Sequence, residues 1–146
     1  MKQILFTLIL FCFIITNTFC QLKYGQKRII FSKETKGDFR DIADTSLQRF
    51  TPDFANIDSA DNLLNKNFKP EFNFTNETLQ YENYYRQYFG VVLADKKCIY
   101  IKGFCQDIGC LMDGHCDVMG GGTCFFKALI DIDSKKILVS RFNAPK

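Results

Sequence analysis

A concentration of cysteines in one short stretch constrains the fold of this chain more than any other feature. The chain of 146 residues holds 7 cysteines, and all but Cys12 and Cys20 lie between Cys98 and Cys124. Glycine is frequent in the same stretch, which ends in a run of three glycines at 120–122. Such glycine density forbids a long helix there. An irregular segment rich in cysteine is typical of a small domain stapled by disulfides.

The first twenty residues indicate the redox compartment in which these cysteines mature. Lys2 supplies a positive charge, residues 4–15 form an apolar run, and residues 16–20 are more polar. This order is typical of a secretory signal peptide, and the apolar run is shorter than the ~20 residues that span a bilayer. We therefore expect an exported protein, periplasmic or secreted, whose cysteines form disulfides by default.

The end of the leader predicts where it is removed. Thr18 and Cys20 are the small residues that a signal peptidase favours, so we expect the mature chain to begin at Gln21. Lipidation of Cys20 is the less favoured alternative, because the three residues before it match a lipoprotein signal poorly. After removal of the leader we expect no membrane span.

Length and charge bound the remaining chain. We expect residues 21–48 to form a polar N-terminal segment and residues 49–146 to form a single domain. The chain has 19 Lys and Arg against 16 Asp and Glu, for a net charge of +3, and the basic residues are scattered. A nucleic-acid partner usually needs a concentrated basic face, so the composition argues against one.

Helical periodicity follows a strong start signal near the middle of the chain. Thr51 is a capping hydroxyl, Pro52 suits a first helical turn, and Asp53 suits the positive helix end. The segment from Pro52 to about Asn67 is therefore predicted to be an amphipathic helix. Its apolar face is predicted to hold Phe54, Ile57, Leu64 and Phe68, whereas its charged side chains, Asp61 among them, lie mostly elsewhere.

Alternating apolar residues predict strands in the second half of the chain. The predicted strands are residues 85–93, 98–102, 124–132 and 137–142, and residues 28–32 could add a short edge strand. The predicted fold class is α+β, in which an N-terminal amphipathic helix packs on an antiparallel meander of about four strands stapled by disulfides.

Short motifs along residues 50–143 resemble a family of small exported proteins of Bacteroidetes-type bacteria. They are Thr51-Pro52, Tyr85-Arg86-Gln87-Tyr88, the strand Ile99-Tyr100-Ile101 leading to Cys105, Gly121-Gly122-Thr123-Cys124-Phe125-Phe126, and Phe142-Asn143. That family is uncharacterised, so the resemblance implies export and a fold but no activity. Carried over by position, Cys105 and Cys124 match the recurring cysteine pair of the family. The chain departs from the family pattern at Ala144, where a glycine is usual.

Strand positions point to the same pair. Cys105 and Cys124 each lie at the edge of a predicted strand, where two chain ends can approach within the ~4.4–6.8 Å Cα separation of a disulfide. We expect Cys110 and Cys116 to form a second, local bridge. Cys98 then remains as a buried thiol within its strand.

The cysteine loop also admits a catalytic or metal-binding interpretation. Cys110, His115 and Cys116 could supply thiolate and imidazole ligands to zinc, or serve a thiol-dependent enzyme. The paired C-x2-C spacing of structural zinc sites is absent, and an oxidising compartment disfavours free thiolates. We therefore expect a non-enzymatic binding or cell-envelope accessory module with no metal and no cofactor, and retain the thiol- or zinc-dependent enzyme as the alternative.

A cluster of tyrosines is the candidate interaction surface of such a module. It comprises Tyr81, Tyr84, Tyr85, Arg86 and Tyr88. Tyrosine and arginine are the residues that protein interfaces favour, so the expected partner is a protein or an envelope component of unknown identity. The competing interpretation divides these tyrosines between the core and an ordinary sheet surface.

Overall fold

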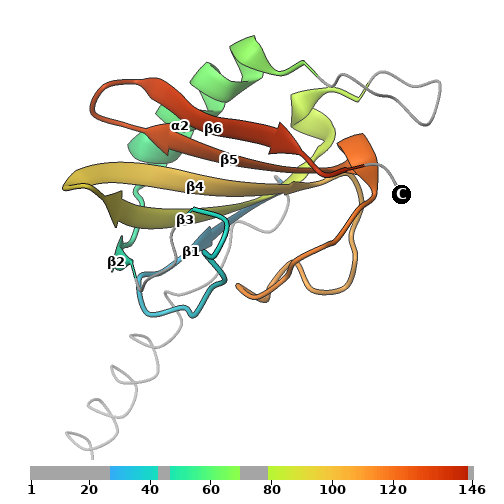
Figure 1. The fold of residues 1–146 in the computed structure, drawn as a ribbon, viewed down its shortest axis with the longest axis horizontal. Helices are drawn as coiled ribbons and strands as arrows, with labels where there is room; N and C mark the ends of the chain where they lie inside the picture. The colour runs from blue at the N-terminus through green and yellow to red at the C-terminus, as the bar shows by residue number, and fades with distance from the viewer. Residues whose placement is uncertain (1–26, 43–46, 70–78, 145–146) are drawn as a thin grey trace, which may run out of the picture.

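The computed structural model describes residues 27–42, 47–69 and 79–144 (Figure 1). The predicted signal peptide, its cleavage site and Cys20 lie outside these residues. The elements in chain order are β1 (Arg28–Phe31), β2 (Gln48–Phe50), α2 (Phe54–Asn67), the 3-10 turn η1 (Tyr81–Asn83), β3 (Tyr85–Leu93), β4 (Lys96–Phe104), the 3-10 turn η2 (Gly122–Cys124), β5 (Phe125–Asp131) and β6 (Lys136–Phe142). Within the described ranges, no helix has the length and apolar character needed to cross a bilayer.

The α+β class is confirmed, but the sheet is larger than predicted and is mixed. Its six strands run in the order β1-β3-β4-β5-β6, and β2 pairs with β3 beyond the end of β1. β1 is parallel to β3, whereas every other pairing is antiparallel. The four predicted strands correspond to β3–β6, and the possible edge strand is β1. β2 escaped prediction because three residues are too few to show an alternating pattern.

The helix forms where the sequence predicts it, but it is not the first element of the fold. Its N-cap is Asp53 and not the predicted Thr51: the side chain of Asp53 accepts a hydrogen bond from the backbone N–H of Asn56 at 2.7 Å. Two strands, β1 and β2, precede it in the chain. Ile57 and Leu64 are buried against the sheet as predicted, whereas Phe54 is 60% exposed. Phe54 is the first residue of α2, and the buried residues of the helix begin one turn later, at Ile57.

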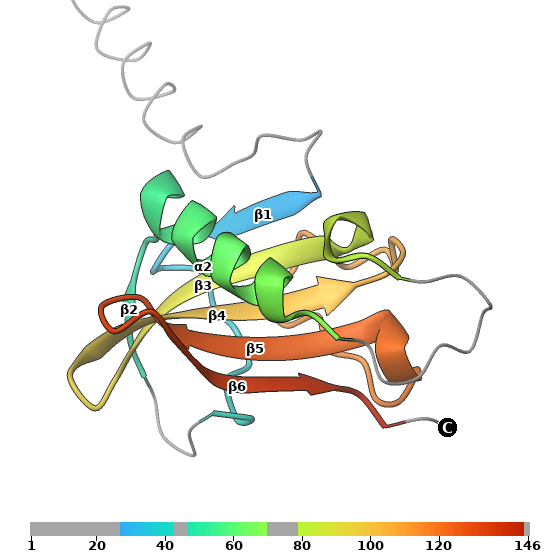
Figure 2. The same ribbon diagram turned by 90° about the horizontal axis from the view of Figure 1, so that it is seen from above.

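Both faces of the sheet are covered, which gives the domain three layers (Figure 2). α2 lies across one face, and loops lie across the other. The helix-side core contains Ile57, Ala60, Leu64, Tyr81, Tyr84, Tyr88, Ile99, Ile101, Phe126, Ala128 and Ile130. The loop-side core contains Ile29, Phe31, Phe89, Val91, Cys98, Tyr100, Phe104, Leu111, Cys116 and Leu129. A cysteine of the loop is thus part of the core on the second face.

Candidate functional site

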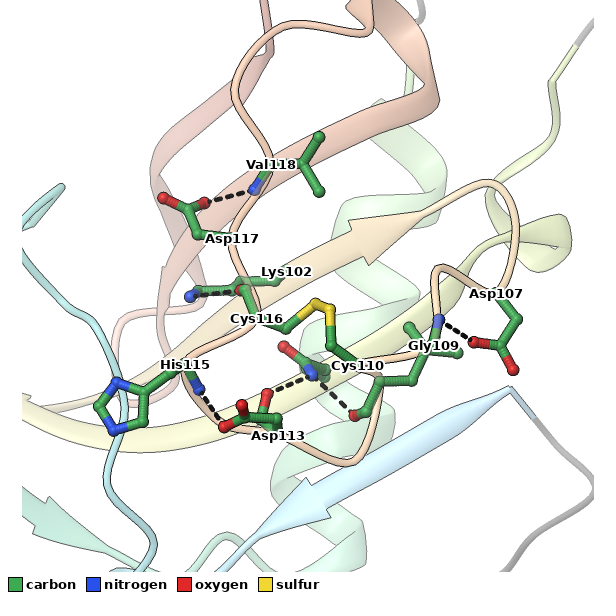
Figure 3. The surroundings of a disulfide bond; sticks show 11 residues. Lys102, Asp107, Gly109, Cys110, Asp113, His115, Cys116, Asp117 and Val118 are labelled. Atoms are coloured by element: carbon green, nitrogen blue, oxygen red, sulfur yellow. Dashed lines mark hydrogen bonds between the residues drawn. A yellow bond between two sulfur atoms is a disulfide. The ribbon is translucent and has the colours of Figure 1, made fainter.

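An irregular loop between β4 and β5 is the first candidate site (Figure 3). The disulfide between Cys105 and Cys124 closes its base, with Cα atoms 4.8 Å apart. The disulfide between Cys110 and Cys116 closes an inner turn, with Cα atoms 5.5 Å apart. Both predicted pairings are confirmed, and Cys98 is a free and buried thiol as predicted. Burial raises the pKa of the Cys98 thiol above its ordinary value, and the carboxylate of Asp131 adds to this.

Two buried polar side chains of the sheet hold the loop from below. Gln87 Nε2 donates to the backbone carbonyls of Leu111 at 2.7 Å and Asp113 at 3.1 Å. Lys102 Nζ donates to the carbonyl of Cys116 at 3.1 Å. Gln87 and Lys102 are partners in the β3–β4 register and therefore point to the same face. Burial lowers the pKa of Lys102. The sequence analysis missed both anchors, because a polar residue in an alternating strand normally predicts a solvent-facing position.

The return of the loop to the sheet depends on glycine. Gly120 and Gly121 have φ angles of 80° and 83°, a left-handed conformation that other residues rarely adopt. A Cβ at Gly121 would lie 2.5 Å from the ring of Phe125. The side-chain amide of Asn143, just after β6, donates to the carbonyls of Val118 at 2.6 Å and Gly120 at 3.0 Å. The backbone here is therefore fixed by local geometry and by a side chain from the far end of the chain.

An ion-pair network connects the β4–β5 loop to the segment between β1 and β2, which covers the same face of the sheet. Lys127 Nζ lies 2.8 Å from Asp117 of the loop and also pairs with Asp41. Asp41 in turn pairs with Arg141 at 3.3 Å and accepts a hydrogen bond from the hydroxyl of Tyr100 at 3.1 Å. Burial acts against the charged form of Lys127, but the hydrogen bonds that its ammonium donates to Asp117 and Asp41 raise its pKa overall. Strands β4, β5 and β6 thus share one polar cluster with both covering loops.

The outer side of the loop carries exposed apolar and imidazole groups. Met112 is 44% exposed and Met119 is 88% exposed. The exposed ring of His115 extends away from the sulfur atoms of the Cys110–Cys116 disulfide (Figure 3). Its backbone N–H is held by the carboxylate of Asp113 at 2.9 Å. Across the three described ranges, no three His, Cys, Asp or Glu side chains are grouped as metal ligands.

The predicted tyrosine surface is for the most part not a surface. Tyr81, Tyr84, Tyr88 and Arg86 are buried, and Tyr85 is half-buried. The hydroxyl of Tyr84 donates to the carbonyl of Thr123, and burial raises the pKa of Tyr84 to about 12. Arg86 and Tyr88 are buried because β3 is flanked by strands on both sides and covered on both faces. Tyr81 and Tyr84, which lie in η1 and just after it, pack into the helix-side core. The competing interpretation, which gave tyrosines to the core, applies to most of the cluster.

The structure gathers Tyr81, Tyr88 and Arg86 around a buried carboxylate. Asp61 of α2 accepts hydrogen bonds on Oδ1 from the hydroxyls of Tyr81 at 2.6 Å and Tyr88 at 2.7 Å. Its Oδ2 accepts from Arg28 Nε at 2.8 Å and lies 3.5 Å from Arg86 Nη1. Burial first, and then the neighbouring acid, raises the pKa of Tyr81.

The burial of Asp61 corrects its predicted place on the helix. Asp61 follows Ile57 by four residues and precedes Leu64 by three, which puts it on the buried helix face. That spacing was visible in the sequence. An acid on the apolar face of a helix signals a buried partner, and here the partners are two arginines and two tyrosines.

A groove of about 420 Å³ opens beside this network, on the helix side of the sheet. It is lined by Arg28, Asp61, Asn62, Asn65, Tyr81, Glu82 and Arg86. Comparison of the chain with protein-family models, curated proteins and solved structures found no match. The features that bear on function are therefore the β4–β5 loop and this groove.

Proposed function

We propose that the chain is a small exported binding module without catalytic activity, and that residues 105–121 form its recognition loop. One observation carries the proposal: the loop is held in one conformation while apolar side chains remain exposed on it. Two disulfides and the buried donors of Gln87 and Lys102 provide the restraint. A preorganised loop loses little conformational entropy on binding, and a loop on a rigid scaffold is a common place for recognition.

The exposed groups suit contact with a macromolecule. Met112 and Met119 offer flexible apolar side chains that adapt to a partner surface, and His115 adds a polar contact between them in the sequence. The partner we propose is a protein or a component of the cell envelope. We also propose that the protein is exported and belongs to the Bacteroidetes-type family. An exported protein would meet partners in the cell envelope or outside the cell.

The disulfide state of the loop favours binding over the alternative, a thiol- or zinc-dependent enzyme. That alternative needs thiolates at Cys110 and Cys116, and the structure bonds these two sulfur atoms to each other. It also needs an imidazole directed at the sulfur, whereas the ring of His115 extends into solvent. Titration of thiols and of bound zinc in the native, unreduced protein separates the two. In the chain that begins at Gln21, where Cys98 is the one free thiol among the described residues, a higher thiol count together with stoichiometric zinc would favour the enzyme.

The recognition loop is tested with a loop variant and a matched control. The double variant Met112→Ser with Met119→Ser removes the exposed loop methionines without touching a disulfide. Leu138→Ser is the control, because Leu138 is 44% exposed on β6, outside the loop. We expect the loop variant to lose retention of an envelope component that wild type and control both retain in equal amount. Equal retention by all three proteins would contradict the role of the loop.

A further inference from the structure

We infer that the groove beside α2 binds a small polar ligand through a carboxylate group held by Arg86. This site lies on the helix side of the sheet, opposite the recognition loop, and is independent of the function proposed for that loop. Its volume of about 420 Å³ falls within the range of ordinary small-molecule sites. The inference depends on which groups of the groove are already engaged within the protein and which are not.

Arg28 and Asp61 are fully engaged with each other and their neighbours. Arg28 uses Nε and Nη2 on Asp61 and donates from Nη1 to Asp58 at 2.9 Å. Both carboxylate oxygens of Asp61 accept several hydrogen bonds, as described above. Burial acts to lower the pKa of Arg28, but its bonds to Asp61 raise it overall. These two residues form a closed pair with little capacity left for a ligand.

Arg86 has capacity left. It is only 7% exposed, and its Nη1 contacts Asp61 at 3.5 Å, longer than a strong hydrogen bond. Its Nε is buried and has no hydrogen-bond partner among the described residues. Its guanidinium lies 4.6 Å from the centre of the Tyr81 ring, which fixes its plane. Arg86 lines the groove, but its Nε lies buried behind that surface. A buried guanidinium with an unpartnered donor calls for an acceptor, and a carboxylate that displaces the atoms covering Nε would accept from arginine in a bidentate manner.

The remaining charges of the groove select among oxyanions. Asp61 and Glu82 of the lining balance Arg28 and Arg86, so the groove offers no excess positive charge to neutralise a multiply charged phosphate. A single carboxylate can be accommodated, provided that the rest of the ligand is neutral or cationic.

The rim of the groove indicates what accompanies the carboxylate. Asn62, Asn65 and Glu82 are exposed there, and Asn65 Nδ2 donates to Glu82 Oε1 at 2.5 Å. Glu82 can accept from a ligand ammonium or hydroxyl group, and Asn62 can pair with either kind of polar group. The ligand chemistry is thus a monocarboxylate with adjacent donors, which free amino acids and uronic acid sugars share.

The test follows the Nε–H resonance of Arg86 by NMR while the folded protein is titrated with alanine, galacturonate, acetate or inorganic phosphate. The resonance is assigned from its loss in Arg86→Lys, which keeps the charge but removes the planar fork. We expect alanine or galacturonate to shift it and to bind at least about tenfold more tightly than acetate. Binding to Arg86→Lys should be weaker by about tenfold or more, because a charge-assisted bidentate contact is lost.

If Arg86→Lys does not fold, variants of residues at the rim of the groove still test whether a ligand binds there. Asn62→Ala should weaken binding, whereas Asn67→Ala, on the same helix but outside the groove lining, should not. Glu82→Gln should weaken an amino acid more than a uronic acid, which identifies the source of the carboxylate. No shift of the Arg86 resonance with any carboxylate, a response to phosphate alone, or equal effects of the two asparagine variants would overturn the inference.

Discussion

Replacement of Asp61 by asparagine should destabilise the fold more than any other change of a single charge. The variant keeps the shape of the side chain but removes the charge that two arginines and two tyrosines share. Arg28, with 25% of its side chain exposed, still has Asp58 as a partner. Arg86, with 8% of its side chain exposed, pairs with no other acid among the described residues and is left as a buried, unpaired charge.

The magnitude follows from that difference in burial. Breaking a buried ion pair by removal of one partner typically costs about 3–5 kcal/mol. A domain of this size has a total unfolding free energy of about 5–15 kcal/mol, so Asp61→Asn should remove a large part of it. The control is Asp58→Asn, because the side chain of Asp58 is 58% exposed and an exposed pair is worth about 0–1 kcal/mol.

The assay is urea denaturation of each variant followed by circular dichroism, with the disulfides intact. Adding Arg86→Gln to Asp61→Asn should cost less than the sum of the two single changes, because the second change removes the charge left unpaired by the first. A cost for Asp61→Asn below about 1 kcal/mol, or equal to that of Asp58→Asn, would refute the claim that this carboxylate organises the helix side of the sheet.

Three further predictions test the helix, the loop and the acid range. Leu64→Ala, at a site only 1% exposed, should cost about 2–5 kcal/mol in a denaturant melt, whereas Phe54→Ala, at 60% exposure, should cost far less. Removal of the Cys105–Cys124 bridge by double substitution with alanine should lower the unfolding free energy by about 3 kcal/mol, measured the same way. The pKa of Asp131 is lowered to about 2 by backbone N–H groups of the following turn. Since a depressed carboxyl pKa stabilises the fold above the unfolded value near 3.8, thermal stability should fall between pH 4 and 2. Asp131→Asn should reduce that fall, and the remainder comes from Asp38 and Asp41, whose pKa values are also lowered.

The sequence predicted the parts of the fold that have strong local signals. The helix has a capping acid and a proline at its start, and β3 to β6 alternate over enough residues to reveal their period. The Cys105–Cys124 pairing was predictable because these residues lie where β4 ends and β5 begins. That position brings their Cα atoms together whatever the loop between them does.

Long-range organisation was not predictable from those signals. The parallel pairing of β1 with β3 brings Ile29 into register with Gln87, far along the chain. The four residues of β1 contain no sequence signal that indicates which strand they pair with. The hydroxyls of Tyr81 and Tyr88 donate to Asp61 inside the protein. A helix prediction that placed this acid off the apolar face therefore left these hydroxyls without a buried partner.

Strand β3 connects the two candidate sites, and the alternation of its side chains explains how. Arg86 and Tyr88 point to the helix side, where both contact Asp61, whereas Gln87 between them points to the loop side and binds the carbonyls of Leu111 and Asp113. A shift of one residue in the β3 register would send Gln87 to the buried acid and the Arg86 cation under the loop. Each polar side chain therefore opposes that slip, so Arg86 of the groove, Gln87 under the loop and Tyr88 on the buried acid together fix the register of the sheet.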